Sequence, residues 1–228
     1  MKGGRFVNPR LLIRALNLFF NWIVNSFVYY GVLLNISNYA GNRYVNNAIA
    51  GVIELPSYVL CTPFLYWGRK VSLCSTLFGA GISLSVIPLL SFLGPGWEWL
   101  TLVVVMFGKV CVTMSFSIVY VITSELYPTV IRGSGVATSS ALARIASALG
   151  PYVTAIEKFD ASLGWTTDVI FGSFALAAGG LALFLPETKG MKMPETMEDA
   201  EHLTPQHAPN KVTPLKKSTT SEMNDLSW

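Results

Sequence analysis

Long apolar stretches separated by short polar connections dominate the chain. Six stretches are each 21 to 26 residues long, and they cover Leu11–Leu34, Val45–Trp67, Val71–Leu93, Trp97–Ile122, Gly133–Ile156 and Trp165–Leu185. A helix of about 20 apolar residues crosses the hydrocarbon core of a bilayer. Most charged side chains lie between or after these stretches, whereas helices of a soluble domain keep a polar outer face. The pattern therefore predicts an all-α membrane protein with six transmembrane helices.

The composition agrees with a chain that crosses the membrane several times. Hydrophobic residues make up 52% of its 228 residues and charged residues 13%, about half the charged share of soluble proteins. The net charge is only +3, and no basic stripe with interleaved aromatic residues is present, so nucleic acid is not an expected partner. His202 and His207 lie in the polar tail, and the three cysteines lie in predicted helices without CxxC spacing. We expect no metal site, no cofactor, no disulfide framework and no enzymatic activity.

The distribution of lysine and arginine orients the predicted helices. The connections on the side of the N-terminus carry eight basic residues, namely Lys2, Arg5, Arg10, Arg69, Lys70, Arg132, Lys189 and Lys192. The opposite side carries two, Arg43 and Lys158. Because the more basic side faces the cytoplasm, we expect both termini there. Residues 1–185 then form a six-helix unit, and residues 186–228, rich in Pro, Thr, Lys and Glu, form a disordered cytoplasmic tail.

One N-glycosylation pattern, Asn35-Ile36-Ser37, falls on the predicted outer side. It directly follows the first predicted transmembrane helix. We therefore expect it to lie too close to the bilayer to be modified.

Polar side chains recur every four residues in the first predicted helix. Asn17, Asn21, Asn25 and Tyr29 lie on one slowly turning face. Two interpretations stay open: hydrogen bonds between packed helices, or the wall of a water-filled cavity.

Ionisable side chains inside the predicted helices are costly to bury and so mark candidate functional positions. Glu54 stands two residues before Pro56 in the second helix, while Lys109 and Arg144 lie near the middle of the fourth and fifth. The two cations need an anionic partner, which is either Glu54 or a carboxylate of the substrate. For Glu54, a structural salt bridge and a substrate contact both remain open.

Aromatic residues complete the candidate site. The rings that we expect to contact an organic ligand, including its ammonium group, belong to Trp22, Tyr29, Tyr30, Phe116 and Tyr120. In the fifth predicted helix, many small residues precede Gly150-Pro151, which predicts a kink. Such a helix fits a moving gate and also fits close static packing.

Three strings near the predicted cytoplasmic ends are more specific than hydropathy. They are Gly68-Arg69-Lys70, the run from Glu125-Leu126-Tyr127-Pro128 to Arg132, and Pro186-Glu187-Thr188-Lys189-Gly190. In this order and spacing they resemble the second half of a major facilitator superfamily carrier, and more narrowly the organic cation, organic anion and carnitine transporter family. Tyr29-Tyr30-Gly31 and Glu54-Leu55-Pro56-Ser57-Tyr58 resemble that family as well. The resemblance covers residues 8–190 and implies the C-terminal half of a twelve-helix major facilitator fold.

The charged residues of these strings form a candidate cytoplasmic network, which we expect to include Arg69, Lys70, Glu125, Arg132 and Glu187. Salt bridges that change between inward-open and outward-open states fit alternating access. Plain anchoring of the topology by positive charge is the alternative.

The resemblance also implies a substrate class. Arg144 matches a position where the anion and carnitine branches resemble one another in carrying Arg and cation carriers have Asp, and Lys109 resembles the basic residue of those two branches. Tyr58 departs from the anion pattern, which has Lys, and resembles the carnitine branch. These matches imply a zwitterionic substrate whose carboxylate meets Arg144 or Lys109 and whose ammonium meets Glu54 and the aromatic rings.

We therefore expect the C-terminal half of a secondary transporter of small organic ions in the plasma membrane, acting by alternating access. Its expected partners are the small organic ion substrate, the lipid bilayer and a first six-helix half, which this sequence lacks. Without that half we expect no transport. The alternative is a truncated, non-transporting membrane partner that modulates a full-length carrier.

Overall fold

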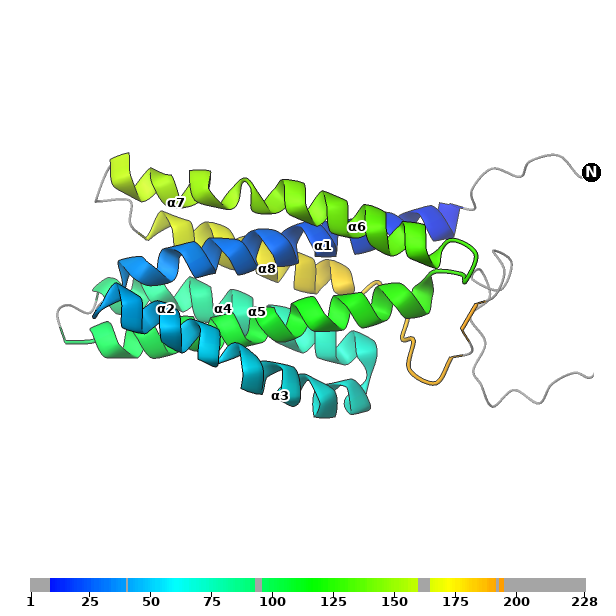
Figure 1. Cartoon of the computed structure of the whole chain (residues 1–228), viewed down its shortest axis with the longest axis horizontal. Coiled ribbons are helices and arrows are strands. Elements are labelled where there is room, and N and C mark those ends of the chain that lie inside the picture. Colours follow the sequence, from blue (N-terminus) through cyan, green and yellow to red (C-terminus); the bar gives the residue numbers. More distant parts are fainter. Residues whose placement is uncertain (1–8, 40, 93–95, 160–164, 192, 195–228) are drawn as a thin grey trace, which may run out of the picture.

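A computed structural model describes residues 9–39, 41–92, 96–159, 165–191 and 193–194. These residues form the helices α1 (Pro9–Asn35), α2 (Arg43–Val52), α3 (Glu54–Trp67), α4 (Arg69–Phe92), α5 (Glu98–Leu126), α6 (Arg132–Ser147), α7 (Gly150–Phe159) and α8 (Thr166–Ala182), with a short 3-10 helix η1 (Ile36–Asn38). The helices lie side by side in one elongated bundle (Figure 1). The predicted tail from residue 195 onward lies outside the described residues, as do Lys2, Arg5 and Lys192.

The six predicted ranges fall on these helices in two ways. The first, third, fourth and sixth each fall on one helix, namely α1, α4, α5 and α8, whereas the second combines α2 with α3 and the fifth combines α6 with α7. Within the described residues, four segments are long and apolar enough to cross a membrane: Leu12–Asn35, Arg43–Trp67, Arg69–Leu90 and Glu98–Leu126. Helix α8 is apolar but shorter, with 17 residues. The chain is therefore a multi-pass integral membrane protein.

Proline accounts for the break between α2 and α3. Pro56 has no N–H to donate to the carbonyl of Val52, and its ring crowds that carbonyl. Helix α2 accordingly ends at Val52 and α3 begins at Glu54. The hydroxyl of Ser57 donates to the carbonyl of Ile53 at 2.7 Å, which satisfies a backbone acceptor at the break. In the same way, α6 ends just before Gly150-Pro151 and α7 begins there.

Helix α1 is central and contacts α5, α6, α7 and α8, while α4 packs on α5 and α8. Small residues allow these close approaches. A Cβ atom on Gly31 of α1 would collide with the ring of Phe171 in α8, and one on Gly172 of α8 would lie 2.5 Å from Ser85 Oγ of α4. Helix α3 contacts α5 but leaves much of its surface exposed, including Leu55 and Val59.

The two ends of the bundle carry different connections (Figure 1). One end holds the start of α1, the α3–α4 turn at Gly68, the α5–α6 connection and the residues after α8; we name it the Gly68 end. The other holds the end of α1 with η1 and the starts of α2, α5 and α8; we name it the Asn35 end. Helices α1 and α6–α7 both run from the Gly68 end to the Asn35 end.

Candidate functional site

A buried ion pair joins α3 to α5. Lys109 Nζ lies 2.7 Å from Glu54 Oε1. Tyr29 of α1 donates its hydroxyl proton to the same oxygen at 2.5 Å, and the Lys109 ammonium lies 3.4 Å from the centroid of the Tyr29 ring. Lys109 is fully buried, whereas the Glu54 side chain keeps 22% of its surface exposed. Three helices thus build one charged site whose accessible group is a carboxylate.

The local structure explains why both charges are tolerated. Each ion neutralises the other at contact distance, which offsets part of the large cost of removing two charges from water. Glu54 is the first residue of α3, and the partial positive charge at a helix start favours a carboxylate there. The Tyr29 ring gives Lys109 a cation–π contact on another side.

Aromatic rings extend the site along α1 and α5. Tyr29 stacks on Phe116 with centroids 5.8 Å apart, and Phe116 meets Tyr120 edge-on at 5.5 Å. Trp22 packs against Tyr120 at 4.2 Å, and Tyr30 packs edge-on against Tyr29 at 5.1 Å. The structure therefore brings all five predicted aromatic residues into one continuous cluster. Trp22 is buried within it, while Tyr30 and Tyr120 are 43% and 39% exposed.

Two further residues, Thr123 of α5 and Tyr58 of α3, border this cluster. Trp22 donates from its indole N–H to Thr123 Oγ1 at 2.8 Å, which fixes the ring against α5. Tyr58 follows Glu54 by four residues on α3, so both project from one face of that helix. Its side chain is half exposed. Tyr58 therefore adds an accessible ring on the face of α3 that carries Glu54.

Two asparagines of α1, Asn17 and Asn25, join it to neighbouring helices. Asn17 donates to the carbonyl of Leu181 in α8 at 2.6 Å, and Asn21 donates to Asn17 Oδ1 at 2.8 Å. Asn25 accepts a hydrogen bond from Ser115 of α5 at 2.6 Å and is buried. For Asn17 and Asn25 the contacts match the interpretation of packed helices, whereas the hydrogen bond of Asn21 to Asn17 lies within α1. Asn25 closes the α1–α5 seam one turn before Tyr29.

Arg144 is exposed and lies in the last turn of α6. Within the described part of the chain, no ion pair joins it to an acid. Gly150, six residues later, approaches the backbone of Gly31 in α1. Because α1 and α6 run in the same direction and rise 1.5 Å per residue, Arg144 lies near the level of Asn25. The structure thus places Arg144 at the depth of the site but not in contact with Lys109 or Glu54.

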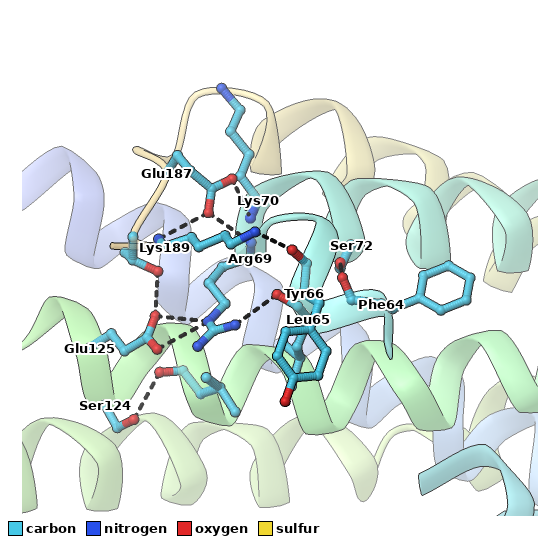
Figure 2. Close-up of polar contacts among 12 residues, drawn as sticks. Phe64, Leu65, Tyr66, Arg69, Lys70, Ser72, Ser124, Glu125, Glu187 and Lys189 are labelled. Atoms are coloured by element: carbon cyan, nitrogen blue, oxygen red, sulfur yellow. Dashed lines mark hydrogen bonds and ion pairs between the residues drawn. The ribbon is translucent and has the colours of Figure 1, made fainter. Parts of the chain in front are cut away.

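A second cluster of charges lies at the Gly68 end (Figure 2). Arg69 Nε contacts Glu125 Oε1 at 3.1 Å, and Arg69 Nη1 donates to the carbonyl of Leu65 at 2.7 Å. Glu125 also accepts a hydrogen bond from the Thr188 hydroxyl. These contacts tie the end of α3, the start of α4, the end of α5 and the segment after α8 together.

Glu187 caps α4 in the same cluster (Figure 2). Its carboxylate accepts from the backbone N–H groups of Arg69 at 2.7 Å and Lys70 at 3.2 Å, which satisfies two of the free donors at the helix start. Gly68 has φ of +151°, and a Cβ atom there would lie 2.9 Å from Glu187 Oε2. Glycine is therefore required at this turn.

Arg132 does not join Glu125 in this conformation. Its Nε donates to the carbonyl of Tyr127 at 3.4 Å, and its Nη2 is buried without a hydrogen-bond partner among the described residues. Burial also raises the pKa of the Tyr127 hydroxyl, so that group stays neutral. Of the predicted network, Arg69, Glu125 and Glu187 thus contribute side chains, Lys70 contributes its backbone, and Arg132 stands apart.

One buried acid, Asp168 in the first turn of α8, is not among the residues predicted from the sequence. It accepts hydrogen bonds from the Tyr39 hydroxyl and from Asn35 Nδ2, the latter at 3.3 Å. The rule that identified Glu54, an ionisable residue inside an apolar range, applies equally to Asp168. Asn35 is 3% exposed and uses its amide in this cluster.

The sequence is similar to a family of transporters and to individual transporters. The sequence family described as Sugar (and other) transporter matches residues 4–200. An organic cation transporter protein of Drosophila melanogaster is 37% identical over 219 residues, which are 96% of this chain and 38% of that protein. Human organic cation/carnitine transporter 2 is 38% identical over 178 residues, covering 78% of this chain and 31% of its own length. The chain thus spans less than two fifths of the curated relatives it matches.

The fold has a counterpart among solved structures. The inward-open xylose transporter of E. coli superposes with a TM-score of 0.54 at 23% identity, over 87% of this chain and 42% of the other. That likeness concerns the fold alone. The relatives are transporters and not enzymes. Because the matching family covers residues 4–200, this chain belongs to the Sugar (and other) transporter family of the major facilitator superfamily.

Proposed function

We propose that this chain forms the C-terminal, six-helix half of a secondary transporter of small organic ions. The observation that carries the proposal is the Glu54 carboxylate, which is held by Lys109 and Tyr29 and stays partly exposed beside aromatic rings. Ionisable groups are retained inside a membrane chiefly where they serve a substrate or ion path. The names of the relatives, organic cation transporter and organic cation/carnitine transporter, support the substrate class.

The site chemistry suits a substrate with an ammonium group. Glu54 offers a charge-assisted contact, and the half-exposed rings of Tyr30, Tyr58 and Tyr120 offer cation–π contacts. Arg144, exposed at a similar depth, offers a guanidinium to a carboxylate. Carnitine-like zwitterions therefore fit best, followed by organic cations and then anions.

Alternating access requires a first six-helix half opposite this face and helices that can bend between states. The helix that carries Glu54 is interrupted at Ile53, between α2 and α3. The helix that carries Arg144 is interrupted just before Gly150, between α6 and α7. At the Gly68 end, Arg69 holds Glu125, while Arg132 Nη2 has no hydrogen-bond partner among the residues that the structure describes. We propose that Arg132 pairs with Glu125 in the opposite state, and that this end and both termini face the cytoplasm of a plasma-membrane carrier.

The test is uptake by cells that express this chain with the first half of a related organic cation transporter. Tetraethylammonium, carnitine and benzoate serve as cationic, zwitterionic and anionic tracers. We expect saturable uptake of carnitine or tetraethylammonium, and Glu54→Gln should reduce it at least about tenfold, because a desolvated charge contact is lost.

The matched control is Glu98→Gln, which alters an exposed glutamate at the start of α5 and should leave uptake unchanged. Absence of saturable uptake, with both halves present at the cell surface, contradicts the proposal. If the chain instead changes the uptake rate of a complete carrier without adding its own, it is a modulating partner.

A further inference from the structure

We infer that Lys109 is a positioning residue that holds Glu54 in place, and that it does not bind the carboxylate of a substrate. The cationic group of the substrate is bound by the second oxygen of Glu54, Oε2. This inference rests on the proposed transport function and assigns the two members of the ion pair different tasks.

The burial of Lys109 excludes it as a substrate contact in this conformation. Its side chain has no exposed surface. Glu54 Oε1 closes one side of the ammonium at 2.7 Å, and the Tyr29 ring closes another at 3.4 Å. A substrate carboxylate that reached Lys109 would first have to displace Glu54, and it would then leave two carboxylates competing for one buried cation. Such an arrangement is unfavourable away from water.

The two oxygens of Glu54 differ in their surroundings. Oε1 contacts both the Lys109 ammonium and the Tyr29 hydroxyl. For Oε2, the described part of the chain provides neither a hydrogen bond nor an ion pair. Because Oε1 is fixed from two sides, the carboxylate group has little freedom to rotate. Oε2 is therefore the oxygen that remains available, and the 22% exposure of the side chain gives a ligand a way to reach it.

The surroundings of this exposed edge favour a cation. Tyr58 projects from the same face of α3 one turn later and is half exposed, and Tyr30 packs on Tyr29 and is 43% exposed. A carboxylate oxygen beside aromatic faces is the environment that binds ammonium and quaternary ammonium groups. Lys109 and Glu54 neutralise each other, so the pair itself offers no net positive charge to an anion. The anionic part of a zwitterion is thereby left to Arg144.

The experiment compares four forms of the chain, expressed with a first half: wild type, Lys109→Met, Glu54→Gln and the double variant. Methionine keeps the straight, flexible shape of lysine but carries no charge. The first readout is the thermal midpoint of the chain in native membranes. The second is the apparent affinity for tetraethylammonium, carnitine and benzoate.

Removing Lys109 alone leaves the Glu54 carboxylate without its counter-ion, so Lys109→Met should lower the thermal midpoint and the uptake of all three tracers together. The double variant leaves no unpaired charge and should recover the thermal midpoint to near the wild-type value. It should still bind tetraethylammonium at least about tenfold more weakly, because Glu54 no longer carries a negative charge. Glu98→Gln is the control for effects of altering a glutamate.

Two results would overturn the inference. One is a Lys109→Met chain with a normal thermal midpoint and normal tetraethylammonium affinity, but a selective loss for carnitine and benzoate; Lys109 would then be the carboxylate ligand. The other is a double variant no more stable than Lys109→Met. If the wild-type pair of halves takes up none of the tracers, the proposed function fails. The thermal midpoints then still decide whether Lys109 and Glu54 neutralise each other in the folded chain.

Discussion

At the scale of single residues, Tyr29 connects the charged and aromatic parts of the site. Its hydroxyl donates to Glu54, its face covers Lys109, and its ring stacks on Phe116. One hydroxyl can be removed while the ring stays. The two contributions can therefore be separated by substitution.

Tyr29→Phe should lower the free energy of unfolding by about 1.5–3 kcal/mol, because a single hydrogen bond to a charged group is lost. Tyr29→Ala should cost clearly more, since it also uncovers Lys109 and leaves a cavity beside Phe116. Thermal midpoints in native membranes provide the measurement. Equal midpoints for the two variants would mean that the ring contributes nothing.

The sequence alone does not identify Lys109 as the ion-pair partner of Glu54. The cost of buried charge marks both residues as important, and the same cost requires a partner of opposite sign. The sequence leaves two candidates for that partner, a protein acid and a substrate carboxylate. Only the packing of α3 on α5 brings positions 55 residues apart to 2.7 Å. For the same reason, hydropathy alone does not decide whether Glu125 pairs with Arg69 or with Arg132.

At the scale of helices, apolar length predicts α1, α4 and α5 well because each is one unbroken helix. The breaks in the second and fifth ranges can also be predicted from the sequence, since Pro56 and Gly150-Pro151 lie next to the positions where the helices stop. The close approach of α1 to α8 cannot be predicted in this way. Gly31 contacts Phe171 across 140 positions of sequence, and nothing in the local pattern separates Gly31 from glycines in open space.

That difference between glycines can be tested with two alanines. Gly31→Ala should destabilise the bundle by about 1–3 kcal/mol, because the new methyl group collides with the Phe171 ring and forces α1 away from α8. Gly180→Ala in α8 is the matched control, since a Cβ atom there meets nothing within 4 Å; it should be neutral or slightly stabilising. Equal loss of stability in both variants would refute the close approach.

At the Asn35 end, the burial of Asn35 leads to a prediction about N-glycosylation. Asn35 donates to Asp168 and is 3% exposed, so its amide is not presented to a glycosylating enzyme. We expect no change in gel mobility when the chain from a eukaryotic host is treated with an N-glycosidase, and Asn35→Gln should migrate as wild type. A shift that Asn35→Gln abolishes would contradict the buried Asn35–Asp168 contact.

Asp168→Ala should lower the free energy of unfolding by about 1–3 kcal/mol, because it removes an acceptor shared by Tyr39 and Asn35.

At the scale of the whole molecule, basic residues set the orientation in the membrane. The Gly68 end holds Arg69, Lys70, Arg132 and Lys189, whereas the Asn35 end holds Arg43 at the start of α2 and Lys158 next to the last residue of α7. By the positive-inside rule we expect the Gly68 end to face the cytoplasm. Epitope tags at either terminus should therefore be unreactive in intact cells and become reactive on permeabilisation. Surface labelling of a C-terminal tag would reverse the orientation and move the Arg69–Glu125 cluster outside the cell.

The same bundle predicts that this chain alone does not transport. Glu54 and Arg144 are at least partly exposed, and Tyr30 and Tyr58 are about half exposed. Lipid against this surface would leave the Arg144 guanidinium in hydrocarbon at a cost of several kcal/mol. A second copy would bring the same Arg144 face to face with its own image, so like charges would meet.

A first six-helix half with acceptors opposite Arg144 removes that cost and supplies the second wall that alternating access requires. Purified chain in liposomes should therefore show no saturable uptake of tetraethylammonium, carnitine or benzoate, and co-reconstitution with a first half should restore it. Saturable uptake by the chain alone, lost on dilution to one copy per liposome, would instead establish a dimeric carrier. The two Arg144 side chains would then have to lie outside the interface between the two copies.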